Sequence, residues 1–439
     1  MKLKTVYICQ ECQHQATKWA GQCSECQAWN SFIEDVVNVG KKDISKTPRK
    51  AVVASTSLSE NPTIQERLNT STSEFDRVMG GGIAKGSITL LSGEPGIGKS
   101  TLTIQIANQI AKNYANTKHP TLIISGEESV EQIAARAHRL KLQHPNLKAI
   151  NEHNLENILE IVRSEKPQIV IIDSIQVISS MDLPSAAGSI TQIRHCTEQV
   201  IQQAKSSNTP VILIGHVTKE GNLAGPRVLE HLVDTVIQLE GDRFQEFRVL
   251  RAAKNRFGSC SEVGIFEMKE EGMVEIKNPS AHLLSGRKDD AIGSAINVTI
   301  EGTRPLLIEV QALVSKSPFG YPKRTANGFD LNRLQLLIAV LEKYGRLNLQ
   351  DQDVFINVVG GMKLNEPAAD LAVLMAIASS FTKKPIPKDT AIFGEVGLSG
   401  ELRKTTHHQK RLKEAEKMGF KKIISPEQFK EVVEIISSF

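Results

Sequence analysis

The chain has 439 residues, 40% of them hydrophobic, which is enough for about three domains with sizeable cores. Its net charge of +4 is modest and does not by itself indicate a nucleic-acid partner. No run of about 18 uninterrupted apolar residues occurs, and residues 1–7 lack the apolar region of a signal peptide. We therefore expect no membrane span and a cytoplasmic protein.

Four of the six cysteines form two C-x2-C pairs near the start of the chain, with ten residues between the pairs. In a reducing compartment, clustered cysteines favour metal binding over disulfides. Four thiolates would close the shell of one zinc ion and leave no open position for catalysis. The ion would also stabilise a segment of about 30 residues, which is too short for a core of its own. The predicted ligands are Cys9, Cys12, Cys23 and Cys26.

Residues 1–35 are thus predicted to form a zinc knuckle, with Trp19, Trp29 and Phe32 packed around the ion. His14 is a spare candidate ligand. A redox role of the C-x-x-C pairs is disfavoured because no βαβ pattern surrounds them, and an iron–sulfur cluster is disfavoured as well. The pattern leaves open whether the knuckle binds DNA, another protein or its own chain.

Residues 36–60 are predicted to be a basic flexible linker. The segment Val36 to Leu58 is rich in Ser and Thr and has neither helical nor strand periodicity. It can contact DNA or be merely solvated. Five cations stand against Asp43 alone: Lys41, Lys42, Lys46, Arg49 and Lys50.

Residues 93–100 read Gly-Glu-Pro-Gly-Ile-Gly-Lys-Ser, which is a phosphate-binding loop, G-x-x-x-x-G-K-[ST]. A β-prone run precedes the loop and a helical pattern follows it, as the motif requires. Lys99 is expected to reach the β- and γ-phosphates of ATP, and Ser100 to hold Mg²⁺. The predicted nucleotide contacts are Gly93, Glu94, Pro95, Gly96, Ile97, Gly98, Lys99, Ser100 and Thr101.

Downstream, apolar strands alternate with amphipathic helices, which predicts a doubly wound α/β ATPase domain over residues 61–280. Asp173 ends one of these strands and is predicted to be the second Mg²⁺ ligand. Glu127 and Glu128 follow another strand, and either can be the general base that activates water. The expected strands cover residues 121–124, 168–172, 211–214 and 235–239.

Two loops are predicted at the carboxyl side of the sheet, residues 179–189 and residues 216–227. They are rich in Gly and Pro, and they can face DNA, with Lys219 and Arg227 on phosphates. The alternative is that both are ordinary connectors. His216, at the end of a strand, is a candidate sensor of the γ-phosphate.

Together these motifs resemble a RecA-type ATPase. With the four cysteines and the pentapeptide Lys254-Asn255-Arg256-Phe257-Gly258, residues 7–439 resemble the bacterial RadA/Sms family of DNA repair and recombination proteins. The resemblance implies ATP bound between subunits, so that Lys254 or Arg256 neutralises γ-phosphate charge in a neighbour and also contacts DNA. It further implies single-stranded and branched DNA as substrates, RecA as a partner and a hexameric ring. The alternative for the pentapeptide is a basic β-hairpin, and Cys260 is expected to be a small core residue.

After a predicted linker at residues 281–293, residues 294–439 resemble the Lon protease domain through segments 302–310, 353–358 and 394–400. Lon enzymes use a Ser–Lys dyad, but Ala368 stands at the serine position and Gln409 near the lysine position. Without a nucleophile and its base, no acyl-enzyme can form. Lys323, Arg324 and the basic stretch 403–422 are candidate phosphate contacts or a solvated face.

The predicted fold class is therefore α/β: a four-Cys zinc knuckle, a RecA-like core and an α+β Lon-like domain without its dyad. The predicted function is an ATP-dependent DNA motor that promotes branch migration, with ATP, Mg²⁺ and Zn²⁺ as cofactors. The alternatives are a nucleotide-gated DNA-binding scaffold without translocation and an ATP-dependent Lon-like protease.

Overall fold

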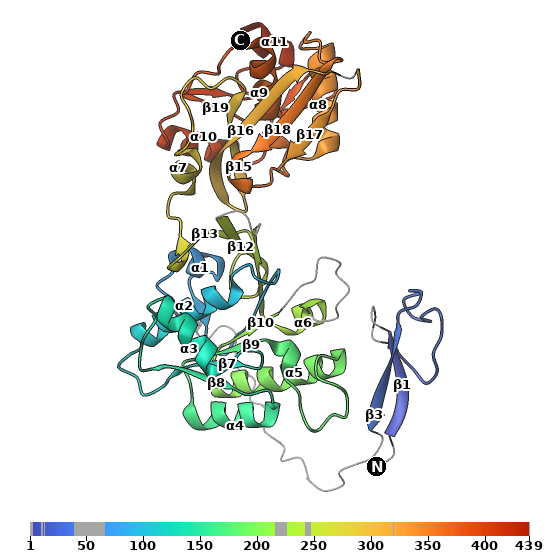
Figure 1. Cartoon of the computed structure of the whole chain (residues 1–439), viewed down its shortest axis with the longest axis vertical. Coiled ribbons are helices and arrows are strands. Elements are labelled where there is room, and N and C mark those ends of the chain that lie inside the picture. Colours follow the sequence, from blue (N-terminus) through green and yellow to red (C-terminus); the bar gives the residue numbers. More distant parts are fainter. Residues whose placement is uncertain are drawn as a thin grey trace, which may run out of the picture. The chain divides into compact units, whose positions relative to one another are not determined.

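The computed structural model describes residues 3–9, 12, 14–38, 66–215, 226–241, 247–318 and 320–438. The chain forms two compact units, labelled in Figure 1 by their elements. One consists of Met1–Leu239, Ala252–Ser259 and Glu270–Met273, and the other of Glu240–Arg251, Cys260–Lys269 and Val274–Phe439. The second unit thus begins earlier along the chain than the Lon-like domain expected from residue 294, and the predicted domain boundaries stay a prediction.

The N-terminal segment is a small antiparallel sheet in which β1 (Leu3–Cys9) pairs with β2 (Gln15–Ala16) and β3 (Phe32–Asn38). The last pair of the β1–β3 register joins Cys9 to Phe32. The side chains of Cys9, Cys23 and Phe32 are buried together, so the described core of this segment is built around cysteines.

The centre of the first unit is a sheet of six parallel strands in the order β11-β6-β10-β9-β7-β8. It confirms the predicted doubly wound core, and all four expected strands are present. Five of the strands are rich in Val, Ile and Leu and are largely buried on both faces, whereas the edge strand β8 is only partly buried. They are β6 (Ile88–Gly93), β7 (Thr121–Ser125), β8 (Leu147–Asn151), β9 (Ile169–Asp173), β10 (Val211–Ile214) and β11 (Thr235–Glu240).

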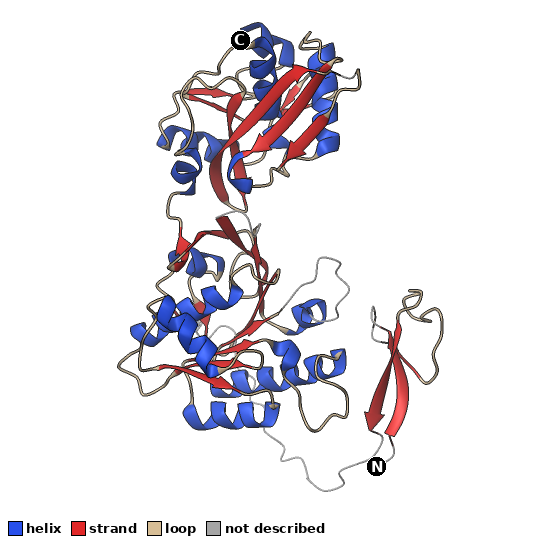
Figure 2. Cartoon of the chain, viewed as in Figure 1, coloured by secondary structure: helices blue, strands red, loops and turns tan. Residues whose placement is uncertain are grey.

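Helices cover both faces of this sheet, α2 (Lys99–Asn113) and α3 (Val130–Arg139) on one side, α4 (Leu155–Glu165) and α5 (Ile190–Ser207) on the other (Figure 2). Side-chain caps start three of them: Ser129 for α3, Asn154 for α4 and Ser189 for α5 each accept a backbone N–H three residues on. The short helix α6 (Pro226–Leu232) leads into β11.

Before the phosphate loop, a short platform forms part of the first unit. It consists of β4 (Arg67–Leu68), α1 (Ser73–Val78) and β5 (Ile83–Ala84), with β4 and β5 antiparallel. After β11, the chain runs through the antiparallel pair β12 (Phe247–Asn255) and β13 (Val263–Lys269) and then β14 (Gly272–Glu275).

The second unit contains a mixed six-stranded sheet in the order β17-β18-β16-β15-β19-β22 and a two-stranded ribbon, β20 (Glu395–Val396) with β21 (Leu402–Arg403). Helix α9 (Asp370–Thr382) is the centre of its core, with residues 370–379 buried. The other elements are α7 (Pro279–Leu284), β15 (Ser294–Glu301), β16 (Arg304–Lys316), β17 (Arg324–Asn327), α8 (Leu331–Lys343), β18 (Gln352–Val358), β19 (Thr390–Ile392), α10 (His408–Lys417), β22 (Lys422–Ile424) and α11 (Val432–Ser438).

Two features of the chain bear on the sequence expectations. Residues 281–284, expected within a linker, end helix α7, and Leu283 is buried in the core of the second unit. Across the described ranges, none of the helices has the length and apolarity needed to cross a membrane.

Candidate functional site

The phosphate loop joins β6 to α2, as its motif requires. Gly98 precedes α2 with φ 114°, a left-handed conformation that a side chain rarely adopts. A Cβ at Gly93 would lie 2.6 Å from the carbonyl oxygen of Leu239 on the neighbouring strand. The loop can therefore follow its path only with glycine at these positions. In this conformation its backbone N–H groups are available for phosphate oxygens.

Lys99 opens α2 and is only 4% exposed. Its Nζ atom donates to the carbonyl oxygens of Gly93 at 2.8 Å and Glu94 at 3.0 Å, so the ammonium lies within the loop. Burial lowers the pKa of Lys99, and the carboxylates of Asp173 and Glu127 only partly offset that effect. The position fits a lysine that binds the β- and γ-phosphates.

Ser100 and Asp173 meet at the carboxyl edge of the sheet. The Ser100 hydroxyl donates to Asp173 Oδ2 at 2.6 Å, and Asp173 is the last residue of β9. A hydroxyl and a carboxylate are oxygen ligands of the kind that Mg²⁺ prefers. The structure thus brings together the two residues that the sequence predicts as Mg²⁺ ligands.

The two glutamates after β7 have different partners. Ser174, next to Asp173, donates to Glu127 Oε1 at 2.5 Å. Glu128 instead accepts hydrogen bonds from both terminal guanidinium nitrogens of Arg136: Nη1 donates to Oε2 at 2.8 Å, and Nη2 donates to Oε1. Glu127 is therefore tied to the residue that follows Asp173, one of the two predicted Mg²⁺ ligands, whereas Glu128 is held by a cation on α3. The sequence reasoning missed Ser174 and Arg136, although Arg136 lies two helical turns beyond Glu128.

The cations of residues 254–258 engage their own chain. Lys254 Nζ donates to the carbonyl oxygens of Glu230 at 2.7 Å and Val233 at 2.8 Å, at the end of α6. Burial, followed by the neighbouring Arg256, lowers the pKa of Lys254. Arg256 lies 3.3 Å from Asp234 Oδ1, and the other oxygen of Asp234 accepts the N–H of Ile88, the first residue of β6. The pentapeptide is thus linked to α6 and to the strand of the phosphate loop.

The loop over residues 179–189 is held by the buried side chain of Gln192. Its Nε2 donates to the carbonyl oxygens of Ser180, Leu183 and Ser185 at 3.0–3.1 Å, and its Oε1 accepts the N–H of Ser180. The sequence of this loop contains no Lys or Arg, so it offers no positively charged side chain for phosphates. In the second loop, His216 and Lys219 lie outside the described residues, and Arg227 is described only as part of α6.

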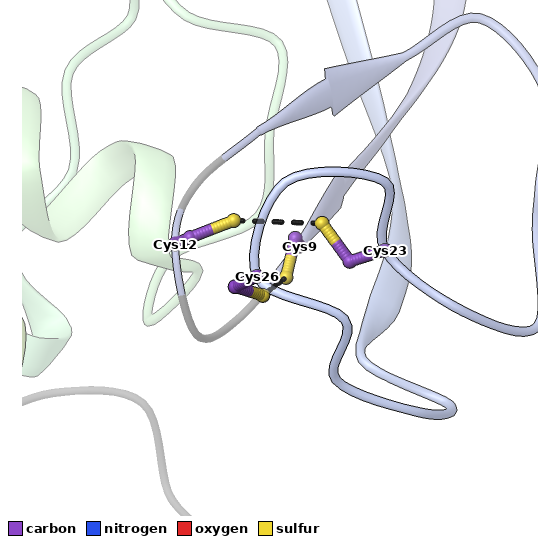
Figure 3. Close-up of side chains that lie close together, drawn as sticks. All are labelled: Cys9, Cys12, Cys23 and Cys26. Atoms are coloured by element: carbon purple, nitrogen blue, oxygen red, sulfur yellow. Dashed lines mark hydrogen bonds between the residues drawn. The ribbon is translucent and has the colours of Figure 1, made fainter.

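The four cysteine side chains of the knuckle point toward one another (Figure 3). All four Sγ atoms lie within 4.8 Å of one another, and the Cys9–Cys26 and Cys12–Cys23 pairs are each 3.5 Å apart. Zinc–sulfur bonds of about 2.3 Å in a tetrahedron put sulfur atoms about 3.8 Å apart, so the cluster fits one zinc ion. His14 is not part of this group and lies 3.3 Å from Ser24 Oγ.

Two expectations about burial are wrong. Trp19 and Trp29 do not pack around the metal cluster but are 57% and 72% exposed. The small core consists of Cys9, Cys23 and Phe32, with Tyr7 and Ala16 packed against them. Cys260 is exposed rather than a core residue, because it lies in the turn between β12 and β13.

In the second unit, Ala368, which is predicted to stand at the position of the Lon serine, is buried. Gln409 is exposed, but Arg411, one α-helical half-turn further, is fully buried. Its guanidinium donates to both carboxylate oxygens of Glu366 at 2.8 and 2.6 Å and to the carbonyl oxygen of Val298. Burial raises the pKa of Glu366, but the hydrogen bonds from Arg411 and Thr299 outweigh this and hold it below its usual value.

The basic residues that the sequence offers as phosphate contacts in this unit differ in accessibility. Lys323 is exposed, whereas Arg324 donates to the backbone carbonyl oxygens of Leu349 and Gln352. Arg324 is thus engaged in holding the β17 edge of the sheet.

Three family models match the chain: a rubredoxin metal binding domain over residues 7–34, an AAA domain over residues 55–222 and subunit ChlI of Mg-chelatase over residues 333–429. They agree with the predicted metal knuckle, P-loop ATPase core and Lon-like C-terminal region.

Whole-length relatives carry the name DNA repair protein RadA. The one from Bacillus subtilis (strain 168) is 45% identical over 433 residues, 97% of this chain and 93% of the relative. The one from Aquifex aeolicus (strain VF5) is 46% identical over 97% of this chain and 94% of its own length. Among solved structures, the KaiC-like protein PH0186 from Pyrococcus horikoshii OT3 matches 48% of this chain and 99% of its own, with 19% identity and a TM-score of 0.40. The ATPase domain of G40P matches 48% of this chain and 91% of its own, with 15% identity and a TM-score of 0.40.

Proposed function

Because this chain belongs to the RadA family of DNA repair proteins, we propose that it is an ATP-driven motor on DNA that promotes branch migration of recombination intermediates. The coarse role, ATP hydrolysis in DNA repair, follows from the family and from the P-loop core. The observation that carries the hydrolytic function is the 2.6 Å contact of Ser100 with Asp173 beside the buried ammonium of Lys99.

Different residues of the site bind the phosphates, hold Mg²⁺ and activate the attacking water. Residues 93–101 hold the phosphates, with Lys99 on the charge of the β- and γ-phosphates and with Ser100 and Asp173 on Mg²⁺. Mg²⁺–ATP, when bound, supplies a γ-phosphoryl group that water can attack. Glu127 accepts the proton of that water, and the Ser174 hydroxyl orients its carboxylate. Glu128 binds Arg136 in the last turn of α3 and thereby links the segment before the helix to its far end.

The catalytic unit would be a pair of neighbouring subunits. Lys254, near the end of β12, donates to carbonyl oxygens at the end of α6, and Arg256, in the turn that follows β12, lies beside Asp234. Exchange of these bonds for a neighbour's γ-phosphate would couple hydrolysis to α6. Helix α6 follows residues 216–225, which include Lys219, and contains Arg227, so its movement would act on the proposed DNA contacts. A closed hexameric ring, single-stranded or branched DNA as the track and RecA as a partner belong to this proposal.

A peptidase function is disfavoured because Ala368 has no hydroxyl and the nearby cation, Arg411, is bound to Glu366. The test measures ATP turnover with and without single-stranded DNA, and in parallel the displacement of a labelled strand from a three-stranded junction. We expect DNA to raise turnover and turnover to displace the strand. Stimulation without displacement would instead indicate a nucleotide-gated scaffold and contradict the motor.

A further inference from the structure

Arg67, on β4, joins the platform before the phosphate loop to the pentapeptide 254–258. Its Nη2 atom donates to the carbonyl oxygen of Phe257 at 2.6 Å. Its Nη1 atom donates to the carbonyl oxygens of Met79 at 3.1 Å and Gly82 at 3.2 Å. One guanidinium thus binds three carbonyl oxygens. One of them lies 190 residues away along the chain, and the other two lie 12 and 15 residues away. A planar fork of five donors suits this task, and the point charge of a lysine does not.

The two turns that Arg67 joins touch through their backbones. A Cβ at Gly80 would lie 3.1 Å from Gly258 Cα, and a Cβ at Gly258 would lie 3.0 Å from Gly80 Cα. Asn255 adds one bond from its Nδ2 to the carbonyl oxygen of Val78 at 3.2 Å. Because glycines form the contact, little side-chain packing fixes the turn, and the hydrogen bonds of Arg67 and Asn255 set its position.

The anchored turn carries one of the proposed cations, Arg256, and directly follows the end of β12, which carries the other, Lys254. Lys254 and Arg256 are bound to the end of α6 and to Asp234. If they leave these partners for a neighbour's γ-phosphate, the anchors at Phe257 and Asn255, together with the backbone bond from Arg256 N–H to the carbonyl oxygen of Asp234 at 3.2 Å, keep the turn on its own subunit. A displacement of about 1 Å at a group that stabilises a transition state costs up to about a hundredfold in rate.

We propose that Arg67 is a positioning residue for ATP hydrolysis: by fixing Phe257 on the turn of residues 79–82, it aims Lys254 and Arg256 at the neighbouring subunit's nucleotide. The inference rests on the proposed function, in which those cations act between subunits. Arg67 itself does not touch nucleotide in this scheme. Loss of Arg67 therefore lowers kcat at the neighbouring subunit's nucleotide, to which Lys254 and Arg256 are supplied. The phosphate loop of the subunit that lacks Arg67 still binds ATP and can be active with an intact neighbour.

The test compares Arg67→Ala, Arg67→Lys and the control Lys85→Ala, whose ammonium binds the exposed Glu66 on the same platform. We expect Arg67→Ala to lower kcat about 10- to 100-fold, with the affinity for a fluorescent ATP analogue within about twofold of wild type. Arg67→Lys should stay low because one ammonium does not replace the fork. An Arg67→Ala kcat equal to that of Lys85→Ala, or a matching loss of ATP affinity, would overturn the inference.

A mixed-subunit experiment separates this inference from its premise. Differently tagged Arg67→Ala and Lys99→Ala chains are co-expressed and purified through both tags, as are Lys254→Ala and Lys99→Ala chains. Both mixtures should hydrolyse ATP faster than either variant alone. In each mixture, the unaltered phosphate loop of one chain can face the unaltered residues 254–258 of a Lys99→Ala chain. Recovery with Lys254→Ala alone would overturn the role of Arg67, including the case in which Arg67→Ala misfolds. Recovery in neither mixture would contradict the shared site and, with it, the Arg67 inference.

Discussion

Lys254 Nζ lies 2.8 Å from the carbonyl oxygen of Val233, so the proposed catalytic cation closes the C-terminal end of α6 within its own subunit. The carbonyls at a helix end lack intrahelical partners and favour a cation there. The same ammonium therefore has a resting partner in its own chain, and its release is linked to α6. This relationship makes the pentapeptide a candidate link between nucleotide and DNA-facing residues.

Replacement of Lys99 by alanine should lower ATP turnover about 10²- to 10³-fold. The buried ammonium is the charge nearest the phosphate cradle, and loss of such a stabilising group costs about 10²–10³ in kcat. Lys112→Ala, at the exposed end of the same helix, is the matched control and should keep wild-type turnover. Steady-state phosphate release measures both, and a Lys99→Ala rate close to that of the control would contradict the assignment.

The two glutamates should separate in mutagenesis. Glu127→Gln should lower kcat by about 10²–10⁴, the usual contribution of a general base, and leave ATP binding intact. Glu128→Gln should act mildly and resemble Arg136→Ala, since both break the same ion pair. Single-turnover hydrolysis together with binding of a non-hydrolysable analogue distinguishes them. The reverse ranking would make Glu128 the base.

The knuckle should hold one zinc ion per chain. Cys23→Ser should lose it, because three thiolates no longer close the tetrahedron around an ion that stabilises a small core. Cys196→Ser, a buried cysteine of α5 outside the cluster, is the control and should keep its zinc. Metal analysis of the purified proteins gives the stoichiometry. Equal zinc in both variants would refute the four-cysteine site.

Acid should remove the contribution of Glu366 to stability. Its pKa in the folded protein lies below the usual glutamate value of 4.5, so the Glu366–Arg411 pair stabilises the fold fully above that pH. The contribution is then lost as the pH falls through the lowered pKa. At pH 7, Glu366→Gln should cost about 3 kcal/mol because Arg411 is left buried without its counter-charge.

Urea unfolding at pH 7 and at decreasing pH below 4.5 measures this effect, with the exposed Glu416→Gln on α10 as the control. The difference between wild type and Glu366→Gln should shrink as the pH falls. A difference that is independent of pH would show that the carboxylate charge does not stabilise the unit.

Restoring a serine should not restore a peptidase. Ala368→Ser would place a hydroxyl in a buried position, but the nearby Arg411 cannot act as a base and is bound to Glu366. Neither wild type nor Ala368→Ser is expected to degrade casein with ATP. Degradation of casein by either protein would contradict this prediction and support a Lon-like peptidase activity.

Short-range patterns predicted much of the core from sequence. Four Val/Ile/Leu runs gave strands within one residue of their ends, and the glycine loop fell between β6 and α2. The four cysteines also meet as their spacing predicts. These features depend on residues that are close in sequence, so local physics decides them.

Partners that are distant in sequence could not be predicted. The sequence around Glu127 and Glu128 does not show that Ser174 binds one glutamate and Arg136 the other. These two partners distinguish the proposed roles of the glutamates. The pairing of Arg67 with Phe257 spans 190 residues and depends on a glycine-to-glycine approach. The exposure of Trp19 and Trp29 was missed because large aromatic residues usually pack into cores, whereas this knuckle is too small to cover them.

The central claim is that ATP hydrolysed at Lys99, with the aid of Lys254, moves DNA. Three-stranded branch migration with wild type, Lys99→Ala and Lys254→Ala, with RecA present to form the junctions, tests it most directly. We predict ATP-dependent migration by wild type and none above background by either variant, with DNA binding retained. Migration by both variants at the wild-type rate would contradict the account.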